Sequence, residues 1–255
     1  MSDRIALQGE QGCFSHLASL EIFPNAEIKF CSTFEETFQL AKENSRYKIV
    51  IPIENSLAGR VADIHYLIPK YKLQVHAEHF HIVNHNLLGI KGSKIKDLKT
   101  VRSHAQAIGQ CQKIISDNNL KPIISADTAG SARFIFEKKD KSEAAIASAL
   151  AAKIYDLEIL KSNIEDEYGN VTRFFIMGKE SNHPELKDKK YITSCIFKVK
   201  SVPAALYKAL GGFATNGVNL CKLESFSVKN TFDQVNFYID IEGHIEDPFL
   251  RKALE

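Results

Sequence analysis

Three short segments combine small polar side chains with the start of a predicted helix. They are residues 9–19 (GEQGCFSHLAS), 52–61 (PIENSLAGRV) and 103–111 (SHAQAIGQC), and each follows an apolar run. The first N–H groups of a helix lack partners within it, and the helix dipole places positive potential there. Ser, Asn and Gln add donors, so such turns can bind a carboxylate or a phosphate. Capping of the helix by these side chains is the alternative interpretation.

A fourth segment, residues 170–175 (NVTRFF), places Thr172 and Arg173 at the start of a predicted strand. An arginine fork can bind a carboxylate through two parallel hydrogen bonds, and an ordinary half-exposed strand is the alternative. Cys13 follows a glycine at a helix start, where a thiol can be activated, but no partner for it can be identified. The Gly9-x-x-Gly12 spacing lacks the full dinucleotide-binding fingerprint.

Four histidines, His76, His79, His81 and His85, fall close together in the sequence. On a strand, His79 and His81 would share one face. No Asp, Cys or further His in the sequence clearly completes a tetrahedral set, so we predict edge or surface histidines and no metal. The five cysteines are scattered without metal-ligand spacing, which predicts free thiols in a reducing cytosol.

The elements that must position these side chains alternate between strands and helices over about residues 1–180. Predicted strands cover residues 5–7, 27–30, 49–53, 75–83, 100–102, 123–125, 144–146 and 173–177. Predicted helices cover residues 15–23, 34–43, 105–117, 129–136 and 148–155. This alternation indicates βαβ units and a mostly parallel sheet, whose ligands bind beyond the carboxyl ends of the strands.

The charged, aperiodic stretch 179–190 (KESNHPELKDKK) predicts a linker to a smaller second unit. In that unit, strand 191–200, a helix from Pro203, strands 218–228 and 232–241, and a helix from Asp247 follow one another. The order β-α-β-β-α is five of the six elements of a ferredoxin-like βαββαβ unit, whose last strand is missing here.

Composition excludes several classes of protein. The chain has 255 residues, with 33 Lys and Arg against 31 Asp and Glu, a formal charge of +2 that gives no footprint for nucleic acid. No apolar run has the length of a membrane helix, and the N-terminus lacks the apolar region of a signal peptide. We therefore expect a cytoplasmic protein with neither nucleic acid nor membrane as a partner.

These motifs, in this order, resemble the prephenate dehydratase family. The matching segments are GEQGCFSHLAS, PIENSLAGRV, SHAQAIGQC, DTAGSARF (127–134), AAIAS (144–148) and NVTRFFIMG (170–178). Residues 202–225 (VPAALYKALGGFATNGVNLCKLES) and 243–248 (GHIEDP) resemble the family's regulatory ACT domain. One departure is Ala105, where the family usually has proline.

The resemblance implies a cofactor- and metal-free lyase that converts prephenate to phenylpyruvate. It assigns the catalytic hydroxyl to Thr172 and leaves the proton donor open between His104 and Glu54. Its implied substrate-binding residues are Ser15, Glu54, Asn55, Ser56, Ser103, His104, Gln106, Arg173 and Phe174. The alternatives are an arogenate dehydratase and a catalytically silent small-molecule sensor on the same scaffold.

The resemblance also implies the α/β architecture. We expect a two-lobed catalytic region similar to type II periplasmic-binding proteins over residues 1–180, and an ACT domain over 191–255. The first lobe would hold residues 1–78 and 160–180, and the second 79–159. A homodimer or homotetramer would bind L-phenylalanine near Ala204, Leu206, Asn216, Asn219, Leu220, Glu224 and Ser225. Ala204 and Phe226 replace a glycine and an arginine of the family pattern, so we predict weak or absent inhibition by phenylalanine.

Overall fold

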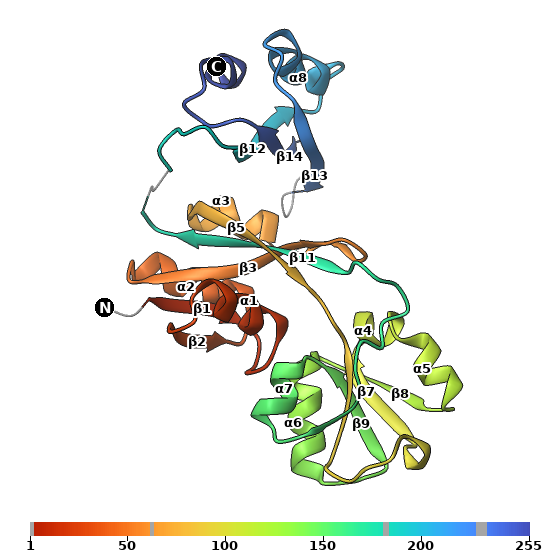
Figure 1. The fold of residues 1–255 in the computed structure, drawn as a ribbon. Coiled ribbons are helices and arrows are strands. Elements are labelled where there is room, and N and C mark those ends of the chain that lie inside the picture. Colours follow the sequence, from red (N-terminus) through yellow and green to blue (C-terminus); the bar gives the residue numbers. More distant parts are fainter. Residues whose placement is uncertain (1–2, 62–63, 181–183, 228–233) are drawn as a thin grey trace. The chain divides into compact units, whose positions relative to one another are not determined.

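The computed structural model describes residues 3–61, 64–180, 184–227 and 234–255, and its contacts divide the chain into two units. The first unit holds Met1–Ile64 and Tyr71–Ser181, and the second holds His65–Lys70 and Asn182–Glu255. Figure 1 labels their helices and strands. No helix within the described residues is long and apolar enough to cross a membrane.

The first sheet of the first unit has the order β2-β1-β3-β11-β5, with β4 paired to β3. Its strands are β1 (Arg4–Gln8), β2 (Glu27–Cys31), β3 (Tyr47–Asn55), β4 (Gly59–Arg60), β5 (Gln74–Ile82) and β11 (Val171–Gly178). Strands β2 and β3 run parallel to β1, whereas β11 runs antiparallel to both of its neighbours. This sheet is therefore mixed, which corrects the mostly parallel sheet that the sequence predicts.

Helices α1 (Phe14–Ile22), α2 (Phe34–Glu43) and α3 (Ile64–Tyr71) come from the same stretch of chain. Helix α1 packs on the face of the first sheet that carries Val50, Phe174 and Ile176. Helix α2 begins at a capping box, in which Thr33 Oγ1 accepts from Glu36 N and the Glu36 carboxylate accepts from Ser32 N. Residues His65–Lys70 of α3 group with the second unit.

The second sheet of the first unit has the order β10-β6-β9-β7-β8. Its strands are β6 (Asn86–Gly89), β7 (Thr100–His104), β8 (Lys121–Ser125), β9 (Glu143–Ala147) and β10 (Glu158–Lys161). Its helices are η1 (Ile95–Asp97), α4 (Ala105–Gly109), α5 (Gln112–Asp117), α6 (Thr128–Lys138) and α7 (Ala149–Ile154). As Figure 1 shows, α4 and α5 lie on one side of this sheet, and α6 and α7 on the other.

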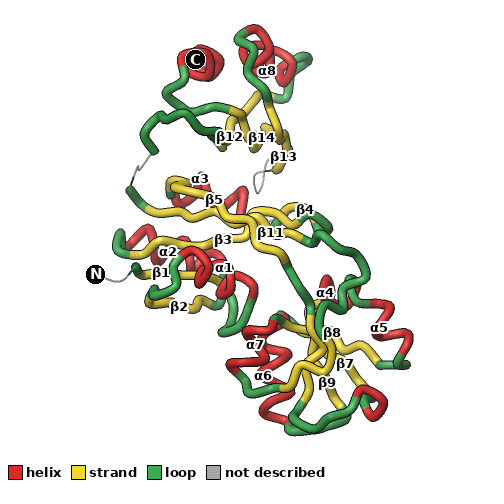
Figure 2. Tube along the Cα trace, in the orientation of Figure 1, coloured by secondary structure: helices red, strands yellow, loops and turns green. Residues whose placement is uncertain are grey.

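The structure changes several predicted elements. Strands β6 and β10 were not predicted, and both run antiparallel to a neighbour. The helix predicted over 105–117 is interrupted, so it becomes α4 and α5. Strand β5 stays in the first sheet to Ile82, so the chain leaves that sheet later than the predicted boundary at residue 78. Figure 2 shows α4 and α5 as separate helices.

The second unit contains β12 (Ile192–Lys200), α8 (Ala205–Thr215), β13 (Leu220–Ser227), β14 (Gln234–Glu242) and α9 (Pro248–Leu254). Its sheet has the order β12-β14-β13, antiparallel throughout, which is the arrangement of the first three strands of a ferredoxin-like unit. Phe213, Ile239, Ile241 and Leu250 form its core between sheet and helices. The predicted loop at 229–231 lies outside the described residues.

Candidate active site

Thr172 sits at the start of β11, between β3 and β5. It pairs with Asn55 of β3 on one side and with His81 of β5 on the other. Residues directly opposite one another in a sheet point to the same face, so these three side chains form a row. Thr172 is buried, at 9% exposure, so its hydroxyl is largely shielded from bulk solvent.

The Asn55 amide is oriented by the turn that follows it. Its Oδ1 accepts from Leu57 N at 3.1 Å and from Ala58 N at 2.8 Å. With the oxygen held by those two N–H groups, Nδ2 points to Thr172 and donates to its Oγ1 at 3.0 Å. The chain thus fixes the Thr172 oxygen as an acceptor, and no described residue accepts the hydroxyl hydrogen.

A chain of side-chain hydrogen bonds extends from Asn55 to His85. Asn55 Nδ2 donates to Asn170 Oδ1 at 2.5 Å, and Asn170 Nδ2 donates to Gln110 Oε1 at 2.9 Å. Gln110 Oε1 also lies 2.8 Å from His85 Nε2. A carbonyl oxygen only accepts, so Nε2 carries the proton and Nδ1 does not. Sequence reasoning missed Asn170 and Gln110 as site residues, although both lie inside quoted motifs.

Burial keeps His85 neutral. Desolvation lowers the pKa of this imidazole, and the hydrogen bond with Gln110 and the charge of Glu165 oppose that shift only in part. The His85 backbone N–H donates to Glu165 Oε2 at 2.9 Å. A neutral imidazole at this end of the network acts as a fixed hydrogen-bond donor rather than as a charge.

Ser56 is occupied by the backbone around Thr172. Its Oγ donates to Gly169 O at 3.0 Å and accepts from Val171 N at 2.9 Å. Its N–H donates to Val171 O at 2.8 Å. Ser56 therefore clamps the segment that leads into β11, and its contact with a substrate stays a prediction.

Arg173 and Glu54 lie on the opposite face of the sheet from Thr172. Successive side chains of a strand alternate between faces, and Arg173 pairs with Glu54 across β11 and β3. The Arg173 guanidinium ion-pairs with Glu54 at 3.1 Å and with Glu78 at 2.7 Å, and Arg173 is 8% exposed. The TRF motif therefore does not bring Arg173 and Thr172 to one ligand, which corrects the predicted substrate roles of Arg173 and Glu54.

Two further predicted contact residues are interior. Phe174 is 1% exposed and packs with Ile5, Ala18 and Val50 beneath α1. Ser103 is fully buried, and its Oγ donates to Ile146 O at 2.6 Å. Both predicted substrate contacts are corrected. Phe174 packs α1 against the first sheet, and Ser103 joins β7 to β9 in the second sheet.

The remaining predicted residues lie at helix starts. Ser15 stands in the first turn of α1 and is buried. His104 is the N-cap of α4, where its Nδ1 accepts from Gln106 N at 3.3 Å. Gln106 is exposed in the first turn of the same helix. Their contact with a substrate stays a prediction.

The glycine-rich turn after β1 is a packing contact. Gly12 has φ +88°, and a Cβ there would lie 2.7 Å from the Ala151 Cα of α7. Ser148 Oγ donates to Gly12 O at 2.5 Å. Burial raises the pKa of the neighbouring Cys13 thiol to about 11, so the thiol stays protonated at neutral pH and an activated thiolate is excluded.

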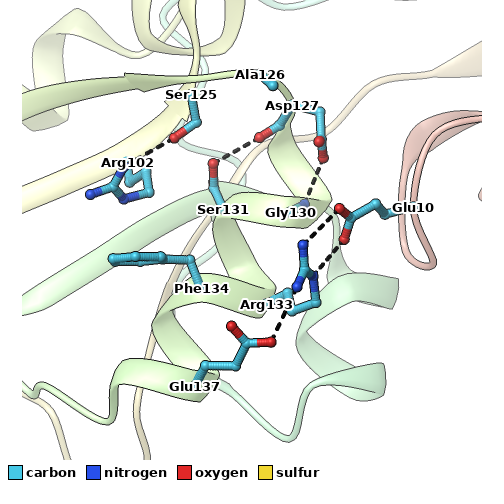
Figure 3. Close-up of a pocket in the computed structure, with 10 residues that line it drawn as sticks. All are labelled: Glu10, Arg102, Ser125, Ala126, Asp127, Gly130, Ser131, Arg133, Phe134 and Glu137. Carbon is cyan, nitrogen blue, oxygen red and sulfur yellow. Dashed lines mark hydrogen bonds and ion pairs between the residues drawn. The ribbon is translucent and has the colours of Figure 1, made fainter. Parts of the chain in front are cut away.

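A pocket of about 240 Å³ lies beside the start of α6 (Figure 3). The Arg102 guanidinium covers the Phe134 ring at 4.1 Å, and its Nη1 donates to Ser125 Oγ at 3.3 Å. Arg133 at the same pocket is already paired with Glu10 and Glu137. Among the described residues no carboxylate pairs with Arg102, so this guanidinium can donate hydrogen bonds to the carboxylate of a ligand.

The predicted effector residues all belong to the second unit. Ala204 is the N-cap of α8 at φ +61°, and Leu206 lies in the first turn of that helix. Asn216 caps the helix end, with Nδ2 donating to Gly212 O at 2.8 Å. Glu224 lies 3.2 Å from Lys222 and 3.6 Å from His65.

The other three predicted effector residues follow in the strand region. Asn219 O accepts from Glu242 N, Leu220 begins β13, and Ser225 is exposed on the same strand. Binding of phenylalanine by any of the seven stays a prediction.

A family model described as prephenate dehydratase matches residues 5–182. A bifunctional N-acyl-homoserine lactone acylase/prephenate dehydratase of Komagataeibacter europaeus is 41% identical over 251 residues, covering 98% of this chain and 89% of that protein. Arogenate dehydratase/prephenate dehydratase 1 of Arabidopsis thaliana is 37% identical over 266 residues, covering 98% of this chain and 67% of that protein.

Two solved structures share the fold over nearly the whole chain. A quorum-quenching acylase, GqqA, superposes with a TM-score of 0.91 at 41% identity, covering 98% of this chain and 91% of that one. A prephenate dehydratase from Arthrobacter aurescens, in complex with L-Phe, gives a TM-score of 0.91 at 26% identity, covering 98% and 84%.

Proposed function

Because the chain belongs to the prephenate dehydratase family, we propose that it converts prephenate to phenylpyruvate with loss of water and carbon dioxide. This is a step towards L-phenylalanine. Prephenate is a dianion on a non-aromatic ring, and loss of the ring carboxylate with the opposite hydroxyl makes the ring aromatic. The driving force lies in the substrate, so the protein has to assist the departing hydroxyl and hold the carboxylates.

The observation that carries the proposal is the fixed hydroxyl of Thr172. Its oxygen accepts from Asn55 Nδ2, and its hydrogen has no acceptor in the described structure. That hydrogen can therefore donate to the substrate hydroxyl, and the bond strengthens as negative charge develops on the leaving oxygen. The donation from Asn55 polarises the Thr172 O–H further, since linked hydrogen bonds reinforce one another.

The proton for the leaving hydroxyl comes from a different group. Of the two candidates from the sequence, Glu54 is paired with Arg173 on the other face of the sheet. We assign the role to His104, which as an imidazolium would give up one ring proton and be left neutral, the state in which its Nδ1 accepts at the start of α4. For a substrate carboxylate we assign Arg102, in place of Arg173, because its guanidinium lines a pocket and lacks a carboxylate partner in the described residues.

Arogenate is the second candidate substrate, because several relatives carry that activity in their names. Arogenate differs from prephenate only by an amine in place of the side-chain keto group. A silent sensor is the third candidate, and the ordered Thr172–Asn55 pair argues against it.

One assay separates these candidates. The purified full chain is given prephenate, arogenate or an N-acyl-homoserine lactone in parallel, the last because of the Komagataeibacter relative. We expect the highest kcat/KM with prephenate, followed as phenylpyruvate absorbance, and its loss in Thr172→Ala. A higher kcat/KM with arogenate would reassign the substrate, and no turnover of either would support the sensor.

A further inference from the structure

Three metal-ligating side chains converge on the Thr172 face of the first sheet, outside the Asn55 network. Glu21 comes from the last turn of α1, and His79 and His81 come from β5. Their ligand atoms all lie within 4.8 Å of one another. The sequence alone offers no third ligand beside the two histidines, because Glu21 is far from them in the chain and only the packing of α1 on β5 brings it there.

The strand spacing presets the two imidazoles. His79 and His81 are two residues apart on β5, so their side chains project from the same face. Both ring nitrogens point at one carboxylate oxygen: His79 Nε2 lies 2.6 Å and His81 Nδ1 3.0 Å from Glu21 Oε2. The site thus already has two nitrogens and one oxygen arranged around a common centre.

These distances are close to those of a coordinated ion. Bonds of about 2.0–2.1 Å in a tetrahedron place neighbouring ligand atoms about 3.3 Å apart. Moving the Glu21 oxygen away from His79 by about 0.7 Å and from His81 by about 0.3 Å would reach that separation. The side chain of Glu21 is 44% exposed and that of His79 is 27% exposed, so both have the freedom to adjust and an ion can enter from solvent.

His81, the third ligand, is buried, and one of its ring nitrogens lacks a hydrogen-bond partner among the described residues. The His81 side chain is 7% exposed, and its ring lies 6.0 Å from that of Phe14. Within the described residues Nε2 of His81 has no hydrogen-bond partner, so Glu21, which contacts Nδ1, is the one polar partner of the His81 ring there. Both Glu21 carboxylate oxygens lie within hydrogen-bond distance of His81 Nδ1, at 3.1 Å and 3.0 Å, so the carboxylate already faces the buried ring nitrogen.

We propose that Glu21, His79 and His81 form a binding site for a divalent transition-metal ion such as Zn²⁺, with a water molecule in the fourth position. Two imidazoles and one carboxylate suit Zn²⁺ and its neighbours in the first row, whereas Mg²⁺ and Ca²⁺ prefer oxygen ligands alone. Each imidazole would coordinate the ion through the nitrogen that now faces Glu21 and carry its proton on the other ring nitrogen, and the ion would tie the end of α1 to β5. The site is independent of the dehydratase proposal.

The test measures zinc binding by the full chain. Protein stripped with a chelator is titrated with Zn²⁺ against a chromogenic zinc indicator, and bound metal is counted by mass spectrometry after dialysis. We expect Glu21→Gln and His79→Ala to bind zinc at least about 10- to 100-fold more weakly than the unchanged chain. Replacing a residue that only hydrogen-bonds to a metal ligand already lowers metal affinity by that factor, and these two residues would be ligands themselves. His76→Ala is the matched control, because His76 lies on the same strand with its Nε2 2.8 Å from Glu180 O.

Thermal melting gives a second readout without activity. Zn²⁺ binds the folded chain, so it should raise the Tm of the unchanged chain and of His76→Ala, but not that of His79→Ala. Because His81 is buried and its replacement endangers folding, the exposed Glu21 and the half-buried His79 carry the test. Equal zinc affinity in the unchanged chain and both variants would overturn the proposal, as would a Tm rise with Mg²⁺ that matches the one with Zn²⁺.

Discussion

The Thr172 hydroxyl should matter for rate more than for folding. Thr172→Ala removes one hydrogen bond that strengthens in the transition state, a loss of about 10²-fold or more in kcat. Thr172→Ser keeps the hydroxyl and should retain more activity than the alanine variant. Steady-state kinetics with prephenate, beside a thermal melt of each protein, makes the comparison. A kcat near that of the unchanged chain in Thr172→Ala would refute the assignment.

Asn55 acts through the direction of one hydrogen bond. In Asn55→Asp, the retained Oδ1 still accepts from Leu57 N and Ala58 N, but an acceptor replaces the donor that faces Thr172. The Thr172 hydrogen would then turn to the aspartate and be lost to the substrate, so kcat should fall by about 10²-fold.

A matched substitution controls for the added charge. Asn44 Oδ1 accepts from Arg46 N in an exposed turn. Asn44→Asp keeps that acceptor and should leave kcat unchanged. Equal activity of both aspartate variants would show that the orientation of Asn55 has no role in the reaction.

At the scale of the element, the alternation of β11 decides what Arg173 does. Its fork joins Glu54 of β3 to Glu78 of β5 across the strand. Arg173→Lys keeps the charge but loses the fork, so unfolding free energy should fall by about 1.5–3 kcal/mol, the worth of a hydrogen bond to a charged group. KM for prephenate should stay the same.

Arg4→Lys is the control, since Arg4 is 39% exposed in its pair with Glu27 and such a pair contributes about 1 kcal/mol or less. Denaturant melts and KM values of both variants separate the two roles. A raised KM at unchanged stability in Arg173→Lys would restore the substrate-binding interpretation.

The start of α8 holds a non-glycine residue in a left-handed conformation. Ala204 has φ +61° and ψ 11°, which costs an L-residue with a Cβ about 1–2 kcal/mol. Ala204→Gly should therefore raise the free energy of unfolding of the second unit by about 1 kcal/mol. Ala209→Gly, inside the same helix, should lower it by about 1 kcal/mol. Denaturant melts followed by circular dichroism compare them, and destabilisation by Ala204→Gly would contradict the prediction.

At the scale of the whole molecule, we predict weak or absent inhibition by phenylalanine. The Ala204 methyl occupies the left-handed position at the start of α8, where a glycine would let a ligand approach the backbone. Glu224, one of the predicted effector residues, is already ion-paired with Lys222. Titrating phenylalanine against prephenate turnover tests this. Strong sigmoidal inhibition at micromolar concentrations would show that contacts of phenylalanine with the backbone outweigh the presence of Ala204 and Phe226 in place of the family's glycine and arginine.

The fold followed from the sequence as far as local pattern reaches. Apolar runs and capping residues predicted most of the strands and helices near their observed bounds, because those signals lie within a few residues, but they missed β4, β6, β10 and α3. Strand direction did not follow, since β6, β10 and β11 take their direction from partners distant in the chain. The β-α-β-β-α order of the second unit was visible in the sequence, whereas the β12-β14-β13 pairing was not.

The candidate site divides in the same way. The sequence by itself determined that Thr172 and Asn55 lie in motifs that resemble one family, because motifs record residue types and spacing, and from this it predicted them as site residues. Only the tertiary structure decided that Arg173 faces away from Thr172, that Asn170 and Gln110 link Asn55 to His85, and that Glu21 joins His79 and His81. The physical reason is that strand alternation and the packing of helices on sheets set where a side chain points, and both depend on residues far away in the chain.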